Sequence, residues 1–143
     1  MIAVDTNVLV YASRSELALH GPALAMLREL AEGDIAWALP WPCIYEFLRI
    51  VTHPRVMNPP TPLDDALESV DALLDSPSVV TLGEGMAHRG HLRRCVHQGQ
   101  TVGNLVHDAH IAALLLEHGV AELITADRDF SRFPGLRVRP LKG

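Results

Sequence analysis

This 143-residue sequence contains four acidic side chains that can be combined into one chemical site: Asp5, Glu46, Asp108 and Asp127. Carboxylates that lie close together raise one another's pKa unless a cation neutralises their charge. Sites that offer only oxygen ligands select Mg²⁺ or Mn²⁺ rather than zinc. Such an ion lowers the pKa of bound water, polarises a phosphodiester and stabilises the leaving oxygen. Brought together, the four acids predict metal-assisted hydrolysis of phosphodiester bonds.

The clearest signal comes from Asp108, which falls in a predicted helix at residues 105–118. Its neighbours three, four and seven residues further along are Ile111, Ala112 and Leu115, which are all apolar. Side chains at these spacings share one helix face, so Asp108 projects from the face that packs on the core. An ionised carboxylate there is costly unless it is paired or binds a metal. The alternative is a charge that stabilises the N-terminal turn of its own helix.

The other three acids each have a structural alternative as well. Asp5 and Asp127 both follow a strand-like run, where an aspartate is also a good cap for the next helix or turn. Glu46 lies off the main apolar stripe of its helix, and a boundary glutamate near Arg49 is an equally good interpretation. The pattern leaves these roles open for each residue alone, and the case for a site rests on the acids together.

Strand-like and helix-like segments alternate along the chain and must position these acids. Short apolar runs predict strands at residues 2–4, 34–39, 78–82, 122–125 and 136–138. Amphipathic periodicity, caps and prolines predict helices at residues 8–12, 15–32, 40–52, 63–74, 84–98 and 105–118, with a turn or short helix at 127–133. This alternation implies an α/β fold with a mostly parallel sheet covered on both faces. Because sites in such sheets form at the carboxyl ends of strands, Asp5 and Asp127 are expected at one edge.

Length and composition limit the class of protein. One domain, residues 1–143, is expected, because a chain of this size buries roughly 70% of its unfolded surface around one core. Hydrophobic residues make up 48% and charged residues 20%, as in ordinary globular proteins. The apolar runs are shorter than the roughly 20 residues of a membrane span, and the first residues lack the pattern of a signal peptide. We therefore expect no membrane partner and a place in the cytoplasm.

The net charge of −5 argues against nonspecific nucleic-acid binding through a basic footprint. The distribution of charge is more informative. Residues 63–75 carry five acids and no Lys or Arg, whereas residues 88–97 carry three arginines and no acid. Arginine suits bidentate phosphate contacts, so these three are candidates, although both segments are also explained as solvated helix faces. The candidates are Arg89, Arg93 and Arg94, with Arg14, Arg49 and Arg55 as equal alternatives.

Two isolated cysteines, Cys43 and Cys95, are expected to be buried thiols rather than a disulfide, because no Cys-x-x-Cys pair or secretory pattern accompanies them. His88, His91 and Cys95 have helical spacing and offer zinc ligands. The pattern supplies no obvious fourth ligand, so a polar helix face is the favoured interpretation.

Four segments together resemble the PIN-domain family, and within it the VapC toxins of bacterial toxin–antitoxin pairs. Residues 2–9, Ile-Ala-Val-Asp-Thr-Asn-Val-Leu, match the opening of the family. Glu46 lies in a helix after the second strand, as the glutamate of the family does. Residues 106–113 and 123–130, each with a predicted site aspartate, resemble the last two acidic motifs. The four motifs occur in family order over the whole chain, which makes the resemblance specific.

The resemblance implies a PIN-like three-layer sandwich and assigns roles to the acids. Asp5 and Asp108 carry over as the principal metal ligands, and Glu46 as a further acid that acts through water. Asp127 carries over as the fourth acid, with Asp129 as its alternative. The polar residues that orient or support the site are then Thr6, Asn7 and Thr125.

The resemblance also implies an activity and partners. It indicates a Mg²⁺- or Mn²⁺-dependent endoribonuclease that cuts tRNA or rRNA and arrests translation, a homodimer, and a small VapB-type antitoxin whose tail fills the groove. RNA is a sensible substrate because exposed loops with splayed bases are the usual targets of sequence-specific recognition. The alternative is a non-catalytic PIN-like module that binds RNA or protein, against which the presence of all four acids argues. An Asp-x-Asp phosphatase is disfavoured by Asn7, and a receiver domain by the absence of a suitable lysine, since Lys142 lies in the tail.

Overall fold

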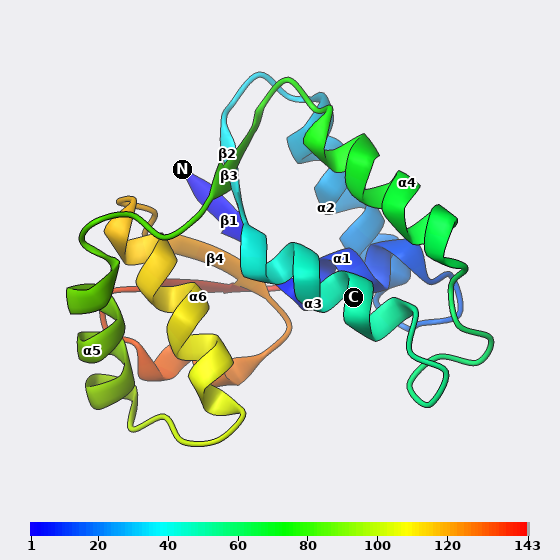
Figure 1. The fold of residues 1–143 in the computed structure, drawn as a ribbon. Helices are drawn as coiled ribbons and strands as arrows, with labels where there is room; N and C mark the ends of the chain where they lie inside the picture. Colours follow the sequence, from blue (N-terminus) through cyan, green and yellow to red (C-terminus); the bar gives the residue numbers. More distant parts are fainter. Residues whose placement is uncertain (143) are drawn as a thin grey trace.

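The computed structural model describes residues 1–142, which form an α/β fold around a five-stranded sheet (Figure 1). The strands are β1 (Ile2–Val4), β2 (Trp37–Pro40), β3 (Val79–Leu82), β4 (Glu122–Thr125) and β5 (Arg137–Pro140). They lie in the order β3-β2-β1-β4-β5, and each neighbouring pair is parallel. The predicted α/β class with a parallel sheet is confirmed.

The described residues also form six α-helices, which flank the sheet in two groups. Helices α5 and α6 lie together at the left of Figure 1, while α1, α2 and α4 gather at the right and α3 lies between the groups. This arrangement gives the expected three layers. The helix bounds are α1 (Thr6–Ser13), α2 (His20–Glu32), α3 (Trp41–Val51), α4 (Leu63–Leu74), α5 (His88–Gly99) and α6 (Leu105–Glu117), and a 3₁₀ helix, η1, spans Arg128–Arg132.

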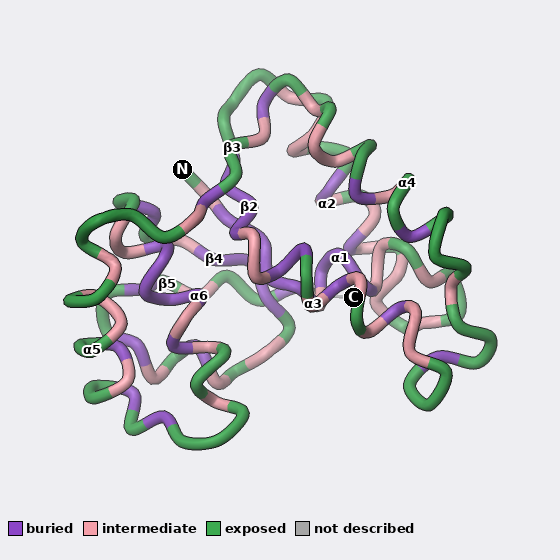
Figure 2. The backbone as a smooth tube through the Cα atoms, viewed as in Figure 1, coloured by how far each residue is buried: buried purple, intermediate pink, exposed green. Residues whose placement is uncertain are grey.

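Burial of the strands follows their place in the sheet (Figure 2). All four residues of β2 are buried, as are the last residues of β1 and β4. The edge strands β3 and β5 are more exposed, and β5 contains three exposed residues, Arg137, Arg139 and Pro140. Charged side chains and proline at an edge oppose pairing with another strand, so the sheet ends there.

The helix expected at residues 15–32 begins only at His20, so its predicted start was wrong. Residues 14–19 form turns in which Leu17 N donates to Arg14 O and His20 N donates to Leu17 O. Pro22 gives the reason. In a helix from residue 15, its ring would meet the carbonyl group one turn earlier, whereas in α2 it lies in the first turn, where proline is tolerated.

The strand expected at 34–39 and the helix expected at 84–98 also begin three or more residues late, at Trp37 and His88. Ile35 is 83% exposed and stays outside the sheet. Before α5, His88 N donates to Gly85 O in a turn, which replaces the first helical turn. The other predicted bounds agree with the structure to within two residues.

The core contains buried apolar side chains from both helix groups and the central strands, with Trp37, Phe47, Phe130 and Phe133 the largest. Cys43 and Cys95 are both buried and free, as expected. None of the helices within residues 1–142 is long and apolar enough to cross a membrane.

Candidate active site

The sheet brings the residues that follow β1 and β4 to one edge. These strands are neighbours and parallel, with Val4 paired to Ile124, and Asp5 N donates to Ile124 O at 3.0 Å. The carboxyl ends of two parallel strands therefore deliver Asp5 and Asp127 to the same side of the molecule, as predicted.

Asp5 is 5% exposed, and both of its carboxylate oxygens accept hydrogen bonds. Its Oδ1 accepts from Thr6 N at 2.7 Å, which caps α1. Its Oδ2 accepts from Thr125 Oγ1 at 2.8 Å and from Asn7 Nδ2 at 3.3 Å. Burial raises the pKa of Asp5 to about 6, although the hydrogen bonds from Thr125 and Thr6 oppose the shift. Asp5 is thus a buried carboxylate whose orientation is fixed by three hydrogen bonds.

Asp108 lies in the first turn of α6 and is half-buried. Burial, followed by the negative charges of Asp127 and Asp5, raises the pKa of Asp108 to about 7. Asp129 and Glu46 raise the pKa further by smaller amounts. All four neighbouring acids therefore act on this one side chain. A group that resists ionisation because acids surround it is typical of a cation site.

Asp127 and Asp129 both lie beside Asp108. Asp127 caps η1, where its Oδ1 accepts from Asp129 N at 2.8 Å, and its own N–H donates to Thr125 Oγ1 at 2.9 Å. Each of the three aspartates offers one carboxylate oxygen, and these oxygens all lie within 4.8 Å of one another. The two aspartates that the sequence offered as alternatives therefore occur together.

Glu46 reaches the cluster from α3. Its Oε2 accepts from Thr6 Oγ1 at 3.1 Å, and its Oε1 lies 3.7 Å from Arg49 Nη2. Glu46 thus borders the cluster and also pairs with Arg49, so the geometry is compatible with both alternatives for this residue. A cavity of about 320 Å³ is lined by all four predicted acids: Asp5, Glu46, Asp108 and Asp127.

The donor set fits a divalent cation that prefers oxygen. The arginines near the cluster reach its outer acids, because Arg49 pairs with Glu46 and Arg132 Nη2 lies 3.9 Å from Asp129 Oδ1. Asp5 and Asp108 have no ion pair with any residue in the range 1–142. A divalent cation from solution would supply the missing positive charge at this cluster of carboxylates.

A groove of about 690 Å³ continues from the cluster between α3 and α6. Tyr45 lines it and is 64% exposed, with its ring stacked on Trp41 at a centroid distance of 6.0 Å. Arg49 and His107 lie on the same groove. Arg49 was among the candidate phosphate contacts, but no pattern in the sequence marked Tyr45, although it directly precedes Glu46 and shares its helix.

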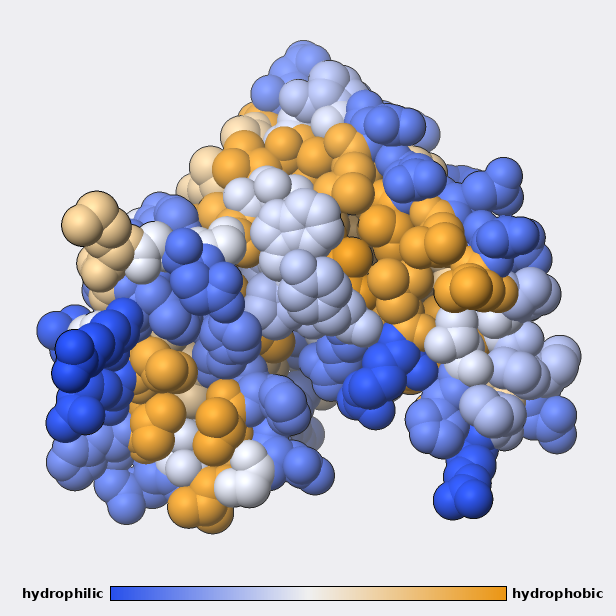
Figure 3. Space-filling view, viewed as in Figure 1, coloured by the Kyte–Doolittle hydropathy of each residue, from blue (hydrophilic) through white to orange (hydrophobic). Residues whose placement is uncertain are grey.

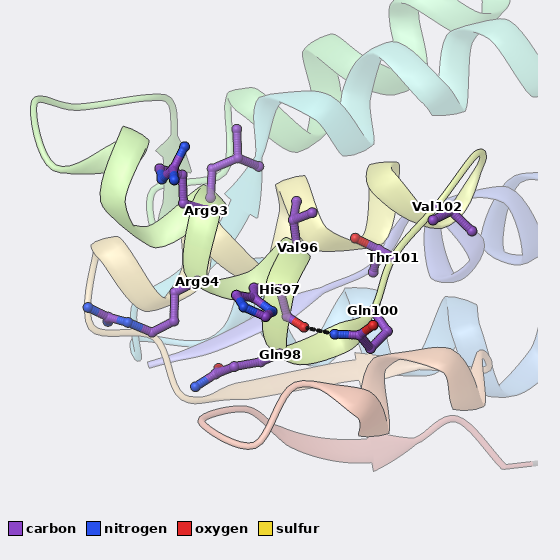
Figure 4. Close-up of a pocket in the computed structure, with 9 residues that line it drawn as sticks. Arg93, Arg94, Val96, His97, Gln98, Gln100, Thr101 and Val102 are labelled. Atoms are coloured by element: carbon purple, nitrogen blue, oxygen red, sulfur yellow. Dashed lines mark hydrogen bonds between the residues drawn. The ribbon is translucent and has the colours of Figure 1, made fainter.

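A second hollow lies along the C-terminal half of α5 and the loop after it. Figure 4 shows Arg93 and Arg94 extending from α5, and the side chain of Gln100 closing back to donate to His97 O at 2.6 Å. Two of the arginines predicted as phosphate contacts therefore line one hollow, of about 890 Å³.

A sequence profile of the PIN domain matches residues 2–136. The chain belongs to the PIN-domain family. The match includes every acid of the cluster, so the family assignment made from four short motifs is confirmed.

Curated relatives of this PIN domain align with nearly its whole length. Ribonuclease VapC43 of Mycobacterium tuberculosis is 42% identical over 144 residues, which cover 100% of this chain and 97% of that protein. Ribonuclease VapC48 of the same organism is 34% identical over 140 residues, with 97% of each chain covered.

Solved structures share the fold at lower identity. The crystal structure of M. tuberculosis VapC20, described as a Sarcin-Ricin loop cleaving toxin, superposes with a TM-score of 0.71 at 18% sequence identity. The superposition covers 98% of this chain and 100% of that chain. VapBC2 from Rickettsia felis, bound to a promoter DNA fragment, gives a TM-score of 0.68 at 21% identity and covers 99% and 100% of the two chains. The PIN-like three-layer architecture is thereby confirmed.

Proposed function

We propose that the whole chain, residues 1–143, is one PIN domain that acts as a metal-dependent endoribonuclease toxin of a VapBC-type pair. The observation that carries this proposal is the acid cluster at the carboxyl ends of β1 and β4, in which Asp5 and Asp108 have pKa values raised to about 6 and about 7. Relatives of 42% and 34% identity named as VapC ribonucleases support the reaction class.

Asp5 and Asp108 would be the principal ligands of the cation, with Asp127 and Asp129 beside Asp108, and Mg²⁺ or Mn²⁺ is the ion we assign. When bound, it supplies activation of water and polarisation of the scissile phosphodiester. Thr125 and Asn7 fix the orientation of Asp5 through their hydrogen bonds to Oδ2. Glu46 contributes a further carboxylate on the groove side and acts through water. Asp5 and Asp108 remain the principal metal-associated acids of the proposal.

The substrate is single-stranded RNA in a tRNA or rRNA loop. The groove beside the acids is lined by Tyr45, whose ring stacks on Trp41, by the cation of Arg49 and by the polar side chain of His107. Unpaired bases stack on exposed aromatic rings, and arginine contacts phosphate, so this wall suits a splayed loop. Cleavage of such RNAs takes place in the cytoplasm and arrests translation.

The partner is a VapB-type antitoxin, whose apolar segment binds the surface that α1, α2 and α4 form together with α3. Apolar side chains gather on this side of the molecule (Figure 3). A groove of about 290 Å³ there is lined mainly by apolar residues, among them Leu9, Leu24, Leu27, Phe47 and Leu73. An apolar helix face fits such a groove, and an arginine of the antitoxin would complement the acid cluster. The active form is a homodimer.

The test is cleavage of total RNA by the purified protein with Mg²⁺ or Mn²⁺, followed by sequencing of the new 5′ ends. Asp108→Asn and Asp5→Asn are expected to lower the rate by at least about 100-fold while the fold persists, because each removes a carboxylate from the cluster. The matched control is Asp34→Asn, which changes an exposed aspartate before β2 and is expected to cleave normally. Full metal-dependent cleavage by both cluster variants would favour a non-catalytic binding module instead.

A further inference from the structure

A second group of metal-ligating side chains lies outside the acid cluster, where α6 meets the segment that leads into α5. It consists of Glu84, His88 and His110, each of which offers one ligand atom, and these atoms all lie within 4.8 Å of one another. Helical spacing in the sequence had offered a different trio, His88, His91 and Cys95. Cys95 is 1% exposed and packs in the core, so His88 is grouped with residues from other segments instead.

The three side chains approach one another from separate segments. Glu84 follows β3, His88 is the first residue of α5, and His110 lies on α6. His110 Nε2 lies 2.7 Å from Glu84 Oε1, and the rings of His88 and His110 have centroids 5.4 Å apart in an edge-on arrangement. Two imidazoles and a carboxylate that converge in this way are a frequent ligand set for zinc.

Glu117 supplies an independent observation that points to a ligand. Its side chain is 5% exposed, and its Oε2 lies 3.4 Å from His88 Nδ1. Neither of these two atoms has a hydrogen-bond partner among residues 1–142, although both are fully enclosed. A buried carboxylate facing one nitrogen of a histidine is the arrangement that orients the other nitrogen toward a metal ion.

Gly85 shows that the segment before α5 passes directly over this carboxylate. A Cβ atom at Gly85 would lie 2.5 Å from Glu117 Oε1. The backbone therefore approaches Glu117 closely, which encloses the carboxylate and keeps His88 and Glu84 beside α6.

We propose that Glu84, His88 and His110 form a Zn²⁺ site, in which Glu117 orients the ring of His88 through Nδ1 and leaves Nε2 for the ion. Imidazole nitrogens favour zinc over Mg²⁺, which prefers oxygen ligands. Water takes the fourth position of a tetrahedron. The site differs in chemistry from the all-carboxylate cluster, and it does not depend on the ribonuclease proposal.

Binding requires Glu84 and His110 to move apart. Ligands about 2.0–2.1 Å from a tetrahedral ion are roughly 3.3 Å apart, so His110 Nε2 and Glu84 Oε1 must separate from 2.7 Å. The side chain of Glu84 is 52% exposed and is free to make this adjustment. The ion then connects the β3–α5 segment to α6, and it does so beside the groove, which His110 also lines.

The test is calorimetric titration of the full-length protein with Zn²⁺, after bound metal has been removed with a chelator and excess Mg²⁺ has been added to occupy the acid cluster. One equivalent of Zn²⁺ is expected to bind the wild type. Glu84→Gln and His88→Ala are each expected to weaken binding by about 100-fold or more, and Glu117→Gln by about 10- to 100-fold. Co²⁺ is expected to give the visible absorption of a tetrahedral site in the wild type, and this signal is expected to be lost in the ligand variants.

Two control variants separate this site from others. His97→Ala removes an exposed histidine of the same helix, and Asp108→Asn removes an acid of the cluster, and both are expected to keep the Zn²⁺ affinity of the wild type. Unchanged affinity in Glu84→Gln, or loss of binding in Asp108→Asn, would overturn the proposal. Because Glu84 is largely exposed, its variant keeps the test valid even where His88→Ala fails to fold.

Discussion

Asp5 has a structural role and a place in the acid cluster at the same time. Its Oδ1 caps α1 through Thr6 N, while its Oδ2 accepts from Thr125 and Asn7. The sequence pattern offered cap and site residue as alternatives, but the end of β1 is both the start of a helix and the edge of the sheet where sites form. Hydrogen bonds to the carboxylate offset part of the cost of burying its charge. The capping interaction therefore also stabilises the ionised form of Asp5 within the cluster.

The raised pKa values of Asp5 and Asp108 predict how the metal-free protein responds to pH. In the folded state these pKa values are about 6 and about 7, against 3.8 for an unperturbed aspartate. Between pH 4 and pH 7 the folded state therefore binds more protons than the unfolded chain, and the free energy of unfolding decreases as the pH rises through this window. Above the folded-state pKa values, this contribution is constant.

Asp108→Asn is expected to flatten this decrease and to raise the free energy of unfolding at pH 8 by about 0.5–2 kcal/mol, because repulsion in the cluster falls. Urea unfolding in EDTA at pH 5 and pH 8 measures the effect, with Asp34→Asn as the control. Mg²⁺ is expected to stabilise the wild type at pH 8 more than the variant. An identical pH dependence in the wild type and Asp108→Asn would contradict the assignment of mutual repulsion.

The sequence predicted the acids better than it predicted their neighbours. Asp108 could be found because its helical neighbours are apolar, and Asp5 because it follows an apolar strand. The pairing of Asp127 with Asp129 depends on the tight turn into η1, which periodicity does not describe. The approach of Glu117 to His88 depends on how α5 packs on α6, and a contact between segments so far apart leaves no local pattern.

At the scale of the helices, α5 depends on a glycine at its last residue. A Cβ atom at Gly99 would lie 2.6 Å from Cε1 of Phe133, a core side chain that is 1% exposed. It would also lie 3.1 Å from Cγ2 of Thr101. The close approach of the helix end to the core therefore requires a residue without a side chain.

Gly99→Ala is expected to lower the free energy of unfolding by about 1–3 kcal/mol, because Phe133 must move within a packed core. Gly90 is the matched control, since it lies in the same helix and has no atom within 4 Å of the added Cβ. Gly90→Ala is expected to raise stability by about 0.5–1 kcal/mol through helix propensity. Denaturant unfolding of both variants measures the difference. Equal changes in the free energy of unfolding would show that the contact with Phe133 does not disfavour a side chain at position 99.

The boundaries of the elements were predictable only where a residue marks them. The cap at Asp5 and the proline pair around residues 40–42 set the starts of α1 and α3 correctly to within two residues. The late start of α2 was also encoded, because Pro22 fits a first helical turn and not a helix interior. The late start of α5 was not, since the passage of Gly85 over Glu117 is a tertiary contact.

The charge of the molecule is divided between its two helix groups. The acidic helix α4 carries Asp64 and Asp65 in its first turn and belongs to the group opposite α5. On α5, Arg93 and Arg94 line the hollow of Figure 4. A net charge of −5 therefore does not describe the face that α5 presents. Attraction of a phosphate backbone depends on this local distribution, because charges further apart than about 8–10 Å are largely screened at physiological ionic strength.

This division predicts how RNA binding depends on salt. Replacing both Arg93 and Arg94 by alanine, in Asp108→Asn protein that does not cleave, is expected to weaken binding of single-stranded RNA. The slope of log affinity against log salt concentration should fall by about 1.4, since each lost contact to a single strand releases about 0.7 fewer counterions. Arg28→Ala, on the exposed surface of α2, is expected to leave the slope unchanged. Fluorescence anisotropy at several salt concentrations measures these slopes. An unchanged slope in the double variant would show that α5 is not part of the RNA-binding surface. Arg49, in the groove beside the acids, would then be the candidate phosphate contact.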